Sequence, residues 1–303
     1  MKNNSIYLIL AVAAMSFASC DKNEQTNGGA AQDDRVAVQF TAGTLEVQPA
    51  AATRSETPWA RPGNIGVYMV EEASLGVVDA AANRNYLWVA SQRTFSPLSP
   101  DQTVYYPVNG SRVRFAAYYP YQALTDNCYK VDLTAQPSLN DQAAFELLWT
   151  GVTTAYDKTQ PSVALNFDHQ YAKISLSVKN GKGITKEELK QIVVTMTEMQ
   201  LTADFNVLTG EITPTGDVGE LTFNRWASDG SGQTALVLPT QADAQRVVNF
   251  TLGSDTFVWN IGEKEFDAGS EYSYTVTVNR TPLGIAASIT DWETGEGGSG
   301  DAE

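Results

Sequence analysis

Few side chains in this sequence could carry out chemistry. The chain of 303 residues has one histidine, His169, directly after Asp168, and two cysteines, Cys20 and Cys128. A His-Asp pair occurs in hydrolase triads, but a triad also needs a placed nucleophile, and no Gly-x-Ser-x-Gly string accompanies this pair. Cys128 and His169 are too few for a Cys/His zinc site, and Cys20 lies in a leader, which leaves Cys128 without a disulfide partner in the chain. We therefore predict no enzyme, no catalytic residue, no metal and no cofactor, and we interpret His169 as structural and Cys128 as an inert thiol.

The first twenty residues predict export and lipidation. Lys2 supplies a positive charge, and residues 6–14 form an apolar stretch that is too short for a transmembrane helix. Residues 17–20, Phe-Ala-Ser-Cys, resemble a lipobox, where signal peptidase II cuts before a cysteine that is acylated. Ordinary cleavage after small residues is the alternative. We predict a lipoprotein signal peptide over residues 1–20, lipidation of Cys20, and a flexible tether over residues 21–35.

A second processing candidate is Arg54. It lies in a stretch without alternation, residues 50–58, which ends at Pro58. Such a stretch is typical of an exposed, cleavable linker. From these residues alone, an ordinary solvated arginine is the plainer interpretation.

The elements that must position these residues are predicted to be strands. Many short stretches alternate apolar and polar residues, and turn signals separate them, which is typical of a sandwich or barrel. Asn109-Gly110 lies between two such stretches and predicts a hairpin. The one convincing helix signal is the capping box of Thr185 and Glu188. The sequence thus predicts an all-β fold with few short helices.

The chain is long enough for two β-sandwich domains. We place the boundary before the stretch that carries Phe167 and His169, which gives an N-terminal domain over residues 36–160 and a C-terminal domain over residues 161–292. Residues 293–303 are acidic and glycine-rich and predict a disordered tail.

The charge of the chain excludes one class of partner. It carries 20 basic and 35 acidic residues, a formal net charge of -15. A surface this acidic repels phosphate backbones, so we predict no nucleic-acid binding. Solubility is the plain interpretation of the acidity.

Several strings follow one another between about Val36 and Trp292. The strings are Trp59 with residues 63–69, residues 105–107 with 113–121, residues 167–169 with 172–174, residues 236–239, residues 266–274, and residues 289–292. In this order and over this span, they resemble the fimbrillin family, the type V pilins and their fimbrillin-like lipoprotein relatives.

The resemblance implies a fold and a mechanism. The fold is two tandem transthyretin-like β-sandwich domains. In that family a lipoprotein precursor reaches the cell surface, a trypsin-like protease cuts after an arginine in the first loop, and a strand of a neighbouring subunit fills the vacated groove. Arg54, followed by Ser55, is the matching position. The partners would be other pilin subunits, with an outer-membrane lipid anchor before maturation and an extracellular fimbrium that supports cell adhesion afterwards.

The segment that would be displaced is residues 36–47. Five of its apolar side chains would be buried in a core, and their burial would contribute on the order of 7–15 kcal/mol to stability before entropy. These side chains are Val36, Val38, Phe40, Leu45 and Val47. We expect an edge strand whose loss exposes unpaired backbone groups that recruit another strand. The alternative is a permanent strand, and a place in mid-sheet with neighbours on both sides would mean that strand replacement at this end cannot operate.

The donor strand is less well defined. Alternating apolar residues near the C-terminus form a candidate donor: Leu283, Ile285, Ala287 and Ile289. These residues could equally pair within their own domain. The tail after Trp292 has no large apolar residue to fill a groove, which leaves tip or accessory roles open beside a shaft role.

Two other functions are weighed against the pilus subunit. One is a non-polymerising surface lipoprotein that binds a host glycan or protein. The other is a glycoside-acting enzyme, which needs two convergent carboxylates in a cleft, and no motif here indicates them.

Overall fold

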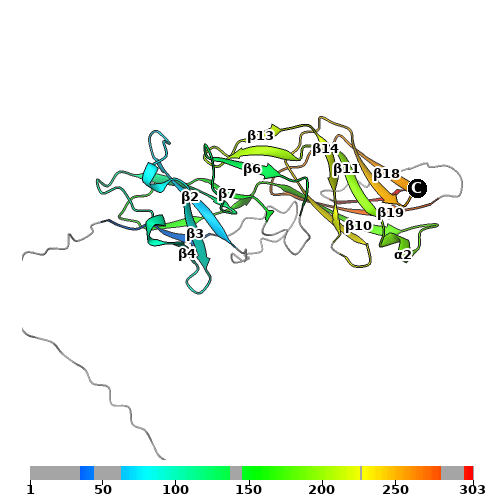
Figure 1. Cartoon of the computed structure of the whole chain (residues 1–303), viewed down its shortest axis with the longest axis horizontal. Coiled ribbons are helices and arrows are strands. Elements are labelled where there is room, and N and C mark those ends of the chain that lie inside the picture. The colour runs from blue at the N-terminus through cyan, green and yellow to red at the C-terminus, as the bar shows by residue number, and fades with distance from the viewer. Residues whose placement is uncertain (1–34, 44–62, 137–144, 226, 281–296, 303) are drawn as a thin grey trace, which may run out of the picture. The chain divides into compact units, whose positions relative to one another are not determined.

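The computed structural model describes residues 35–43, 63–136, 145–225 and 227–280 with their side chains, and residues 297–302 by their backbone. All of the described residues belong to one compact unit, which begins at Arg35. The fold is all-β, as predicted, with four sheets in the described part of the chain (Figure 1). Its helical segments are α2 (Lys186–Leu189), with the predicted Thr185–Glu188 capping box, and the 3₁₀ turns Asp79–Ala81 and Pro100–Gln102.

The largest sheet has eight strands in the order β8-β1-β4-β3-β2-β5-β7-β9. In chain order these are β1 (Gln39–Ala42), β2 (Asn64–Glu71), β3 (Arg84–Val89), β4 (Thr94–Pro97), β5 (Val113–Tyr119), β7 (Leu148–Val152), β8 (Ser162–Leu165) and β9 (Asp168–His169). The hairpin predicted at Asn109-Gly110 does not form, because β5 pairs with β2 and β7.

Strand β5 explains why this sheet is central. Its alternate residues Val113, Phe115 and Ala117 face one core, and Ala116 and Tyr118 face a second core on the other side. Successive side chains of a strand point to opposite faces, so β5, which is apolar at every position except Arg114, is buried on both. The first of these cores lies within the N-terminal sheet and includes the first strand of the chain.

The second half of the chain contributes two further sheets. One has the order β15-β16-β10-β19-β20, with β10 (Ala172–Asn180), β15 (Asn224–Arg225), β16 (Gly232–Val237), β19 (Glu271–Val278) and β20 (Gly297–Ala302). The other has the order β14-β11-β17-β18, with β11 (Val193–Met199), β14 (Gly219–Thr222), β17 (Arg246–Leu252) and β18 (Asp255–Gly262). Apolar residues of both sheets share one core, to which β10 contributes Ile174, Leu176 and Val178.

A three-stranded sheet connects the two halves. It consists of β6 (Cys128–Asp132), β12 (Thr202–Asn206) and β13 (Ile212–Thr215), and β6 pairs with β12 across the sequence-based boundary. Strands β8 and β9 also belong to the N-terminal sheet, although they follow residue 160. The pairing therefore differs from the predicted division at 160/161, because strand partners are set by long-range packing that local patterns do not record.

The side chain of Trp149 on β7 contacts the three-stranded sheet and so joins it to the eight-stranded sheet. Its indole Nε1–H donates to the carbonyl of Val207 at 2.8 Å, and its ring is edge-on to Phe205 with centroids 5.7 Å apart. Gly210 lies under the same ring with φ of +75°, and a Cβ there would overlap the indole. The turn between β12 and β13 therefore needs glycine at this position.

The end of the chain differs from the predicted disordered tail. The backbone of residues 297–302 forms β20, parallel to β19 at the edge of its sheet. The sequence there is Gly-Gly-Ser-Gly-Asp-Ala. A strand without apolar alternation cannot be found from side-chain patterns, because only its backbone pairs.

Candidate functional site

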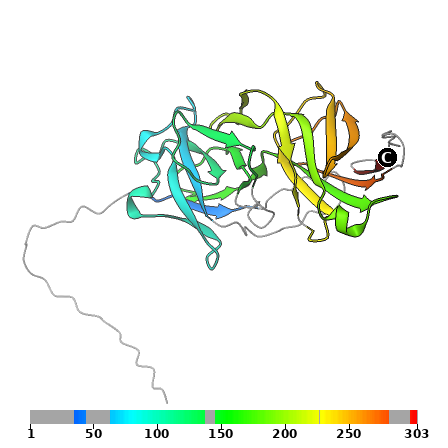
Figure 2. The ribbon, with the colours of Figure 1, turned by 45° about the vertical axis from the view of Figure 1, so that its right-hand side comes forward.

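The first strand lies inside the eight-stranded sheet. It runs antiparallel to β4, with Phe40 opposite Phe95, and parallel to β8, with Phe40 opposite Val163. In Figure 2 the blue β1 lies among strands that come much later in the chain. The expected edge position is therefore wrong. Alternation indicates which face of a strand is buried, but it does not indicate which strands lie beside it.

The backbone of the segment 36–43 is hydrogen-bonded along both sides. On one side, residues 36 and 38 bond to residues 106 and 104, with N···O distances of 2.9 Å. On the other side, residues 39 and 43 donate to the carbonyls of residues 161 and 165 at 2.9 and 2.7 Å. Removal of this segment would leave backbone N–H and C=O groups without partners on both sides of it.

The inward side chains follow the predicted alternation. Val38 is 5% exposed and Phe40 is fully buried, while Val36 and Ala42 pack against the same core at its border. At about 1.5–3 kcal/mol for each fully buried side chain, Val38 and Phe40 contribute about 3–6 kcal/mol before entropy.

Two rings, which we call the aromatic seat, contact Phe40. Its ring lies 5.0 Å from that of Tyr86 at 90°, and 5.3 Å from that of Phe115 at 82°. The Tyr86 hydroxyl accepts the N–H of Val104 at 2.8 Å. Burial raises the pKa of Tyr86 to about 12, so this phenol is neutral at physiological pH. The seat belongs to β3 and β5, which both follow β1 in the chain.

Both ends of the segment are also fixed. The guanidinium of Arg35 stacks 4.1 Å above the ring centroid of Tyr105. At the other end, a Cβ on Gly43 would overlap the side-chain oxygen of Asn166 and lie 3.1 Å from the carbonyl oxygen of Leu165. The backbone of Gly43 therefore approaches its neighbours more closely than a side chain allows.

The remaining predicted site residues lie outside the described ranges. They are Cys20, Leu45, Val47, Arg54, Ser55, Leu283, Ile285, Ala287 and Ile289. Of the five side chains predicted for the first strand, Val36, Val38 and Phe40 are described.

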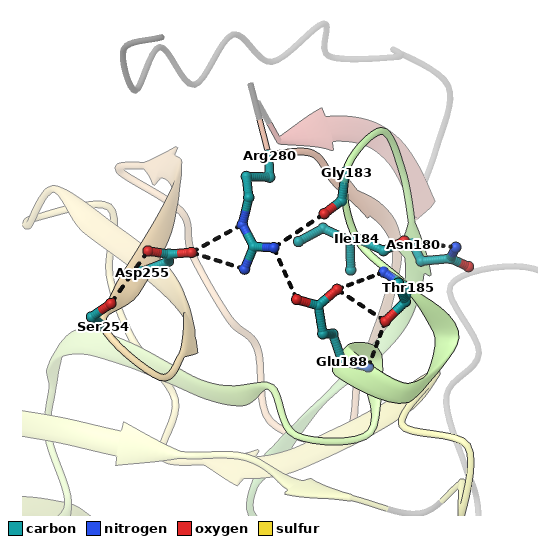
Figure 3. Close-up of polar contacts among 8 residues, drawn as sticks. All are labelled: Asn180, Gly183, Ile184, Thr185, Glu188, Ser254, Asp255 and Arg280. Carbon is teal, nitrogen blue, oxygen red and sulfur yellow. Dashed lines mark hydrogen bonds and ion pairs between the residues drawn. The ribbon is translucent and has the colours of Figure 1, made fainter. Parts of the chain in front are cut away.

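Arg280 is the last described residue before the candidate donor segment. Figure 3 shows its guanidinium between two carboxylates: Nη1 is 2.9 Å from Glu188 Oε1, and Nη2 is 2.8 Å from Asp255 Oδ2. Nη1 also donates to the carbonyl of Gly183 at 3.2 Å. Hydrogen bonds from the Thr185 N–H and from Arg280 lower the pKa of Glu188 to about 2. The point at which the chain leaves β19 is thus held by charged contacts.

His169 lies in a cavity of about 200 Å³ but faces Glu146. Its Nδ1 is 3.1 Å from Glu146 Oε2, and across the cavity Lys173 Nζ is 3.4 Å from Glu271 Oε1. The neighbouring Asp168 is exposed, and consecutive residues of a strand point to opposite faces. The geometry therefore offers no Asp168–His169 dyad, and the two contacts within the cavity join His169 to Glu146 and Lys173 to Glu271.

Cys128 begins β6 and is half-buried. Burial, reinforced by the nearby Asp204 carboxylate, raises the pKa of its thiol, so the less reactive protonated form is favoured. In the ranges with described side chains, no group of three or more His, Cys, Asp and Glu residues could hold a metal ion. The same ranges contain no helix with the length and apolarity needed to cross a bilayer.

Sequence reasoning missed β4, one of the two neighbours of the first strand, and β3 beside it. β3 carries Tyr86 of the aromatic seat. The signal in β3 is weak, because Leu87 stands between the aromatic residues Tyr86 and Trp88 and breaks a simple apolar–polar alternation. β4 has only four residues and ends in Pro97, which is too short for a pattern to be recognised.

Comparisons with known proteins agree with this architecture. A family described as fimbrillin-like matches residues 52–292. A Bacteroides uniformis protein named as a candidate fimbrium subunit, Fim1C, is 30% identical, and the alignment covers 100% of both chains. The crystal structure of a candidate cell adhesion protein from the same species shares 31% identity and covers 82% of this chain and 94% of its own, with a TM-score of 0.67. A Bacteroides ovatus structure, also a candidate cell adhesion protein, has a TM-score of 0.64 at 20% identity, covers 80% and 92% of the two chains, and indicates the fold alone.

Proposed function

Because the chain belongs to the fimbrillin-like family, we propose that it is a fimbrium subunit assembled by strand exchange at β1. In this proposal it is exported as a lipoprotein, anchored in the outer membrane through Cys20, and cut between Arg54 and Ser55. Its first strand then leaves, and a strand of another pilin subunit takes its place. The relatives named as fimbrium subunit and cell adhesion protein support a place at the cell surface and a role in adhesion rather than catalysis.

The observation that carries the proposal is the topology of β1. It is the first strand of the sheet in the chain, and its neighbours β4 and β8 are joined to it only through long stretches of chain. One cut in the segment between residues 43 and 63 therefore separates β1 from the rest of the unit. From the sequence, a mid-sheet position was expected to rule out replacement, and β1 has that position. A terminal strand in mid-sheet can nevertheless be released by a single cut, and it leaves a slot with a hydrogen-bonding strand on each side.

The slot would require an incoming strand that pairs on both sides. Such a strand restores two ladders and the burial of two apolar side chains, so exchange is slow and the product is kinetically stable.

The lipid anchor is proposed from the sequence of the leader. Residues 17–20 place a cysteine directly after small residues, and Cys20 is the residue that would be acylated. Residues 21–34 then separate the anchor from Arg35, the first described residue.

The test is limited trypsin digestion of the processed chain, purified from membranes in detergent, with and without partner pilins. Mass spectrometry should locate an early cut after Arg54, and unboiled gel samples should then show ladders of multimers. Arg54→Gln should abolish both the cut and the ladder. A chain that is cut after Arg54 and stays monomeric with partner pilins present contradicts strand exchange.

A second function is favoured by the two-sided pairing of β1. Hydrogen bonds along both edges also suit a permanent strand, and the chain would then be a non-polymerising surface lipoprotein that binds a host glycan or protein. The same digestion separates the two functions, since the first strand would then stay bound to the cut protein through gel filtration.

A further inference from the structure

We infer that the β1 slot selects its partner by an aromatic residue. This inference rests on the proposed strand exchange. The occupant is a strand of another subunit with an aromatic side chain at the Phe40 position and glycine three residues later, at the Gly43 position.

The first reason is the geometry of the aromatic seat. Phe40 is fully buried, and both contacting rings are nearly perpendicular to it, with centroids 5.0 and 5.3 Å away. Perpendicular packing matches the positive edge of one ring to the negative face of another, which an aliphatic side chain cannot do. The seat therefore favours an aromatic side chain over an aliphatic one of similar volume.

The second reason is that the seat is built without β1. The Tyr86 hydroxyl is held by the Val104 N–H at 2.8 Å, and Phe115 also packs edge-on against Tyr106 with centroids 6.0 Å apart. These residues lie outside the segment that leaves. The groups that shape the pocket thus belong to the part of the subunit that remains after the cut. An incoming strand would again have to pair with Val104 and Tyr106, which are hydrogen-bonded to residues 38 and 36 in the uncut chain.

The third reason is register. Phe40 stands opposite Phe95 on β4 and opposite Val163 on β8, so two ladders fix its position. A slip of one residue would turn the aromatic side chain to the other face of the sheet. An incoming strand must therefore present its ring at one defined position.

The glycine requirement follows from the end of the strand. The N–H of Gly43 donates to the Leu165 carbonyl at 2.7 Å, and a Cβ would overlap the Asn166 side chain. The Asn166 side chain is exposed and can rotate away from such a Cβ at a small cost in free energy. We therefore expect glycine to matter less than the aromatic residue.

The pattern also separates two segments near the C-terminus of this chain. Residues 38–43 read Val-Gln-Phe-Thr-Ala-Gly, and residues 290–295 read Thr-Asp-Trp-Glu-Thr-Gly, with Trp292 and Gly295 at matching positions. The candidate donor over residues 283–289 contains no aromatic residue. By the aromatic criterion, residues 290–295 of a second copy suit the slot better than residues 283–289, with Trp292 as the one apolar side chain, because Thr290 stands at the Val38 position.

The experiment uses the chain cut after Arg54, from which the first strand has been released in dilute urea. Labelled synthetic peptides are added, and binding is followed by fluorescence polarisation. The peptide 35–47 should bind, Phe40→Leu should weaken its binding, and Phe40→Ala should reduce affinity by roughly tenfold or more. Peptide 286–297 should bind, lose binding with Trp292→Ala and keep it with Trp292→Phe, whereas peptide 281–290 should not bind.

A matched variant tests the glycine. Gly43→Ala in peptide 35–47 should bind several-fold more weakly, and Asn166→Gly in the protein should restore its affinity. Equal binding of the native and Phe40→Ala peptides would overturn the inference and leave strand exchange intact. Failure of the native 35–47 peptide to bind would instead count against the proposed function.

Discussion

The ring of Phe40 stands perpendicular to the ring of Tyr86, with 5.0 Å between their centroids. Phe40 lies on the first strand of the chain, and Tyr86 lies on β3, where the Val104 N–H holds its hydroxyl. The contact therefore joins β1, which a single cut in the proposed processing would separate from the chain, to β3, which would remain. Its strength should therefore be measurable in the uncut protein as well as in peptide binding.

Truncation of Phe40 should destabilise the uncut protein. Phe40→Ala removes a fully buried ring and leaves a cavity beside Tyr86 and Phe115, so we expect a loss of about 3–5 kcal/mol in the free energy of unfolding. Urea denaturation followed by tryptophan fluorescence measures it. Thr41→Ala, on the other face of the same strand, is the control and should change stability by about 1 kcal/mol or less. Equal losses for the two variants would show that the ring is not the main contribution of β1.

Gly210 should be far less tolerant of alanine than Gly253. Both have positive φ, +75° and +61°, but a Cβ on Gly210 would overlap Trp149, whereas nothing lies within 4 Å of a Cβ on Gly253. Gly253→Ala should cost about 1–2 kcal/mol from backbone strain alone. Gly210→Ala should cost about 1–3 kcal/mol more, because the indole must also move. Thermal unfolding of both variants measures these losses of stability. Similar losses for the two variants would mean that the Trp149 side chain moves aside at no cost in free energy.

The contact of Glu188 with Thr185 and Arg280 should weaken in acid. The pKa of Glu188 falls from its ordinary value of 4.5 to about 2 in the folded chain, through the Thr185 N–H and then Arg280. A lowered folded-state pKa stabilises the fold above the unfolded pKa, and this contribution is lost as the pH falls from about 4.5 to about 2. Glu188→Gln should therefore be less stable than the native chain at pH 7, and the difference in urea midpoint should shrink over that range. A difference that is constant with pH would show that the charge of Glu188 is not involved.

Lipidation should depend on Cys20 alone. Cys20→Ser should abolish incorporation of an alkyne-labelled fatty acid, because it removes the acceptor thiol, and should remove the chain from the detergent-extracted membrane fraction. Cys128→Ser is the matched control and should be labelled like the native chain, since Cys128 lies half-buried in β6. Labelling that persists in Cys20→Ser would place the acylation elsewhere.

The local features of the fold were predictable from the sequence. The alternation of Val38 and Phe40 indicated their common face, and the spacing of Thr185 and Glu188 indicated the capping box that the structure contains. These features depend on residues a few positions apart, within the reach of a periodic pattern.

The arrangement of the strands could not be read in the same way. The Asn109-Gly110 string resembles a hairpin turn, yet β5 pairs with β2 and β7 because its two apolar faces must both be covered. Phe40 of β1 stands opposite Phe95 on β4 and Val163 on β8, and nothing in the sequence of the segment 36–43 indicates either pairing. The glycine-rich β20 pairs through its backbone, which leaves no side-chain signal.

The parallel ladder between β1 and β8 has a consequence for biogenesis. Residue 40 is synthesised well before residue 163, yet the two stand opposite each other in the finished sheet. The ladder between β1 and β8 therefore cannot form until more than half of the polypeptide has been synthesised. Contacts this distant in sequence form slowly, because a long loop must close first. The strand β1 thus obtains one of its two neighbours late, and until then its apolar side chains lack part of their core.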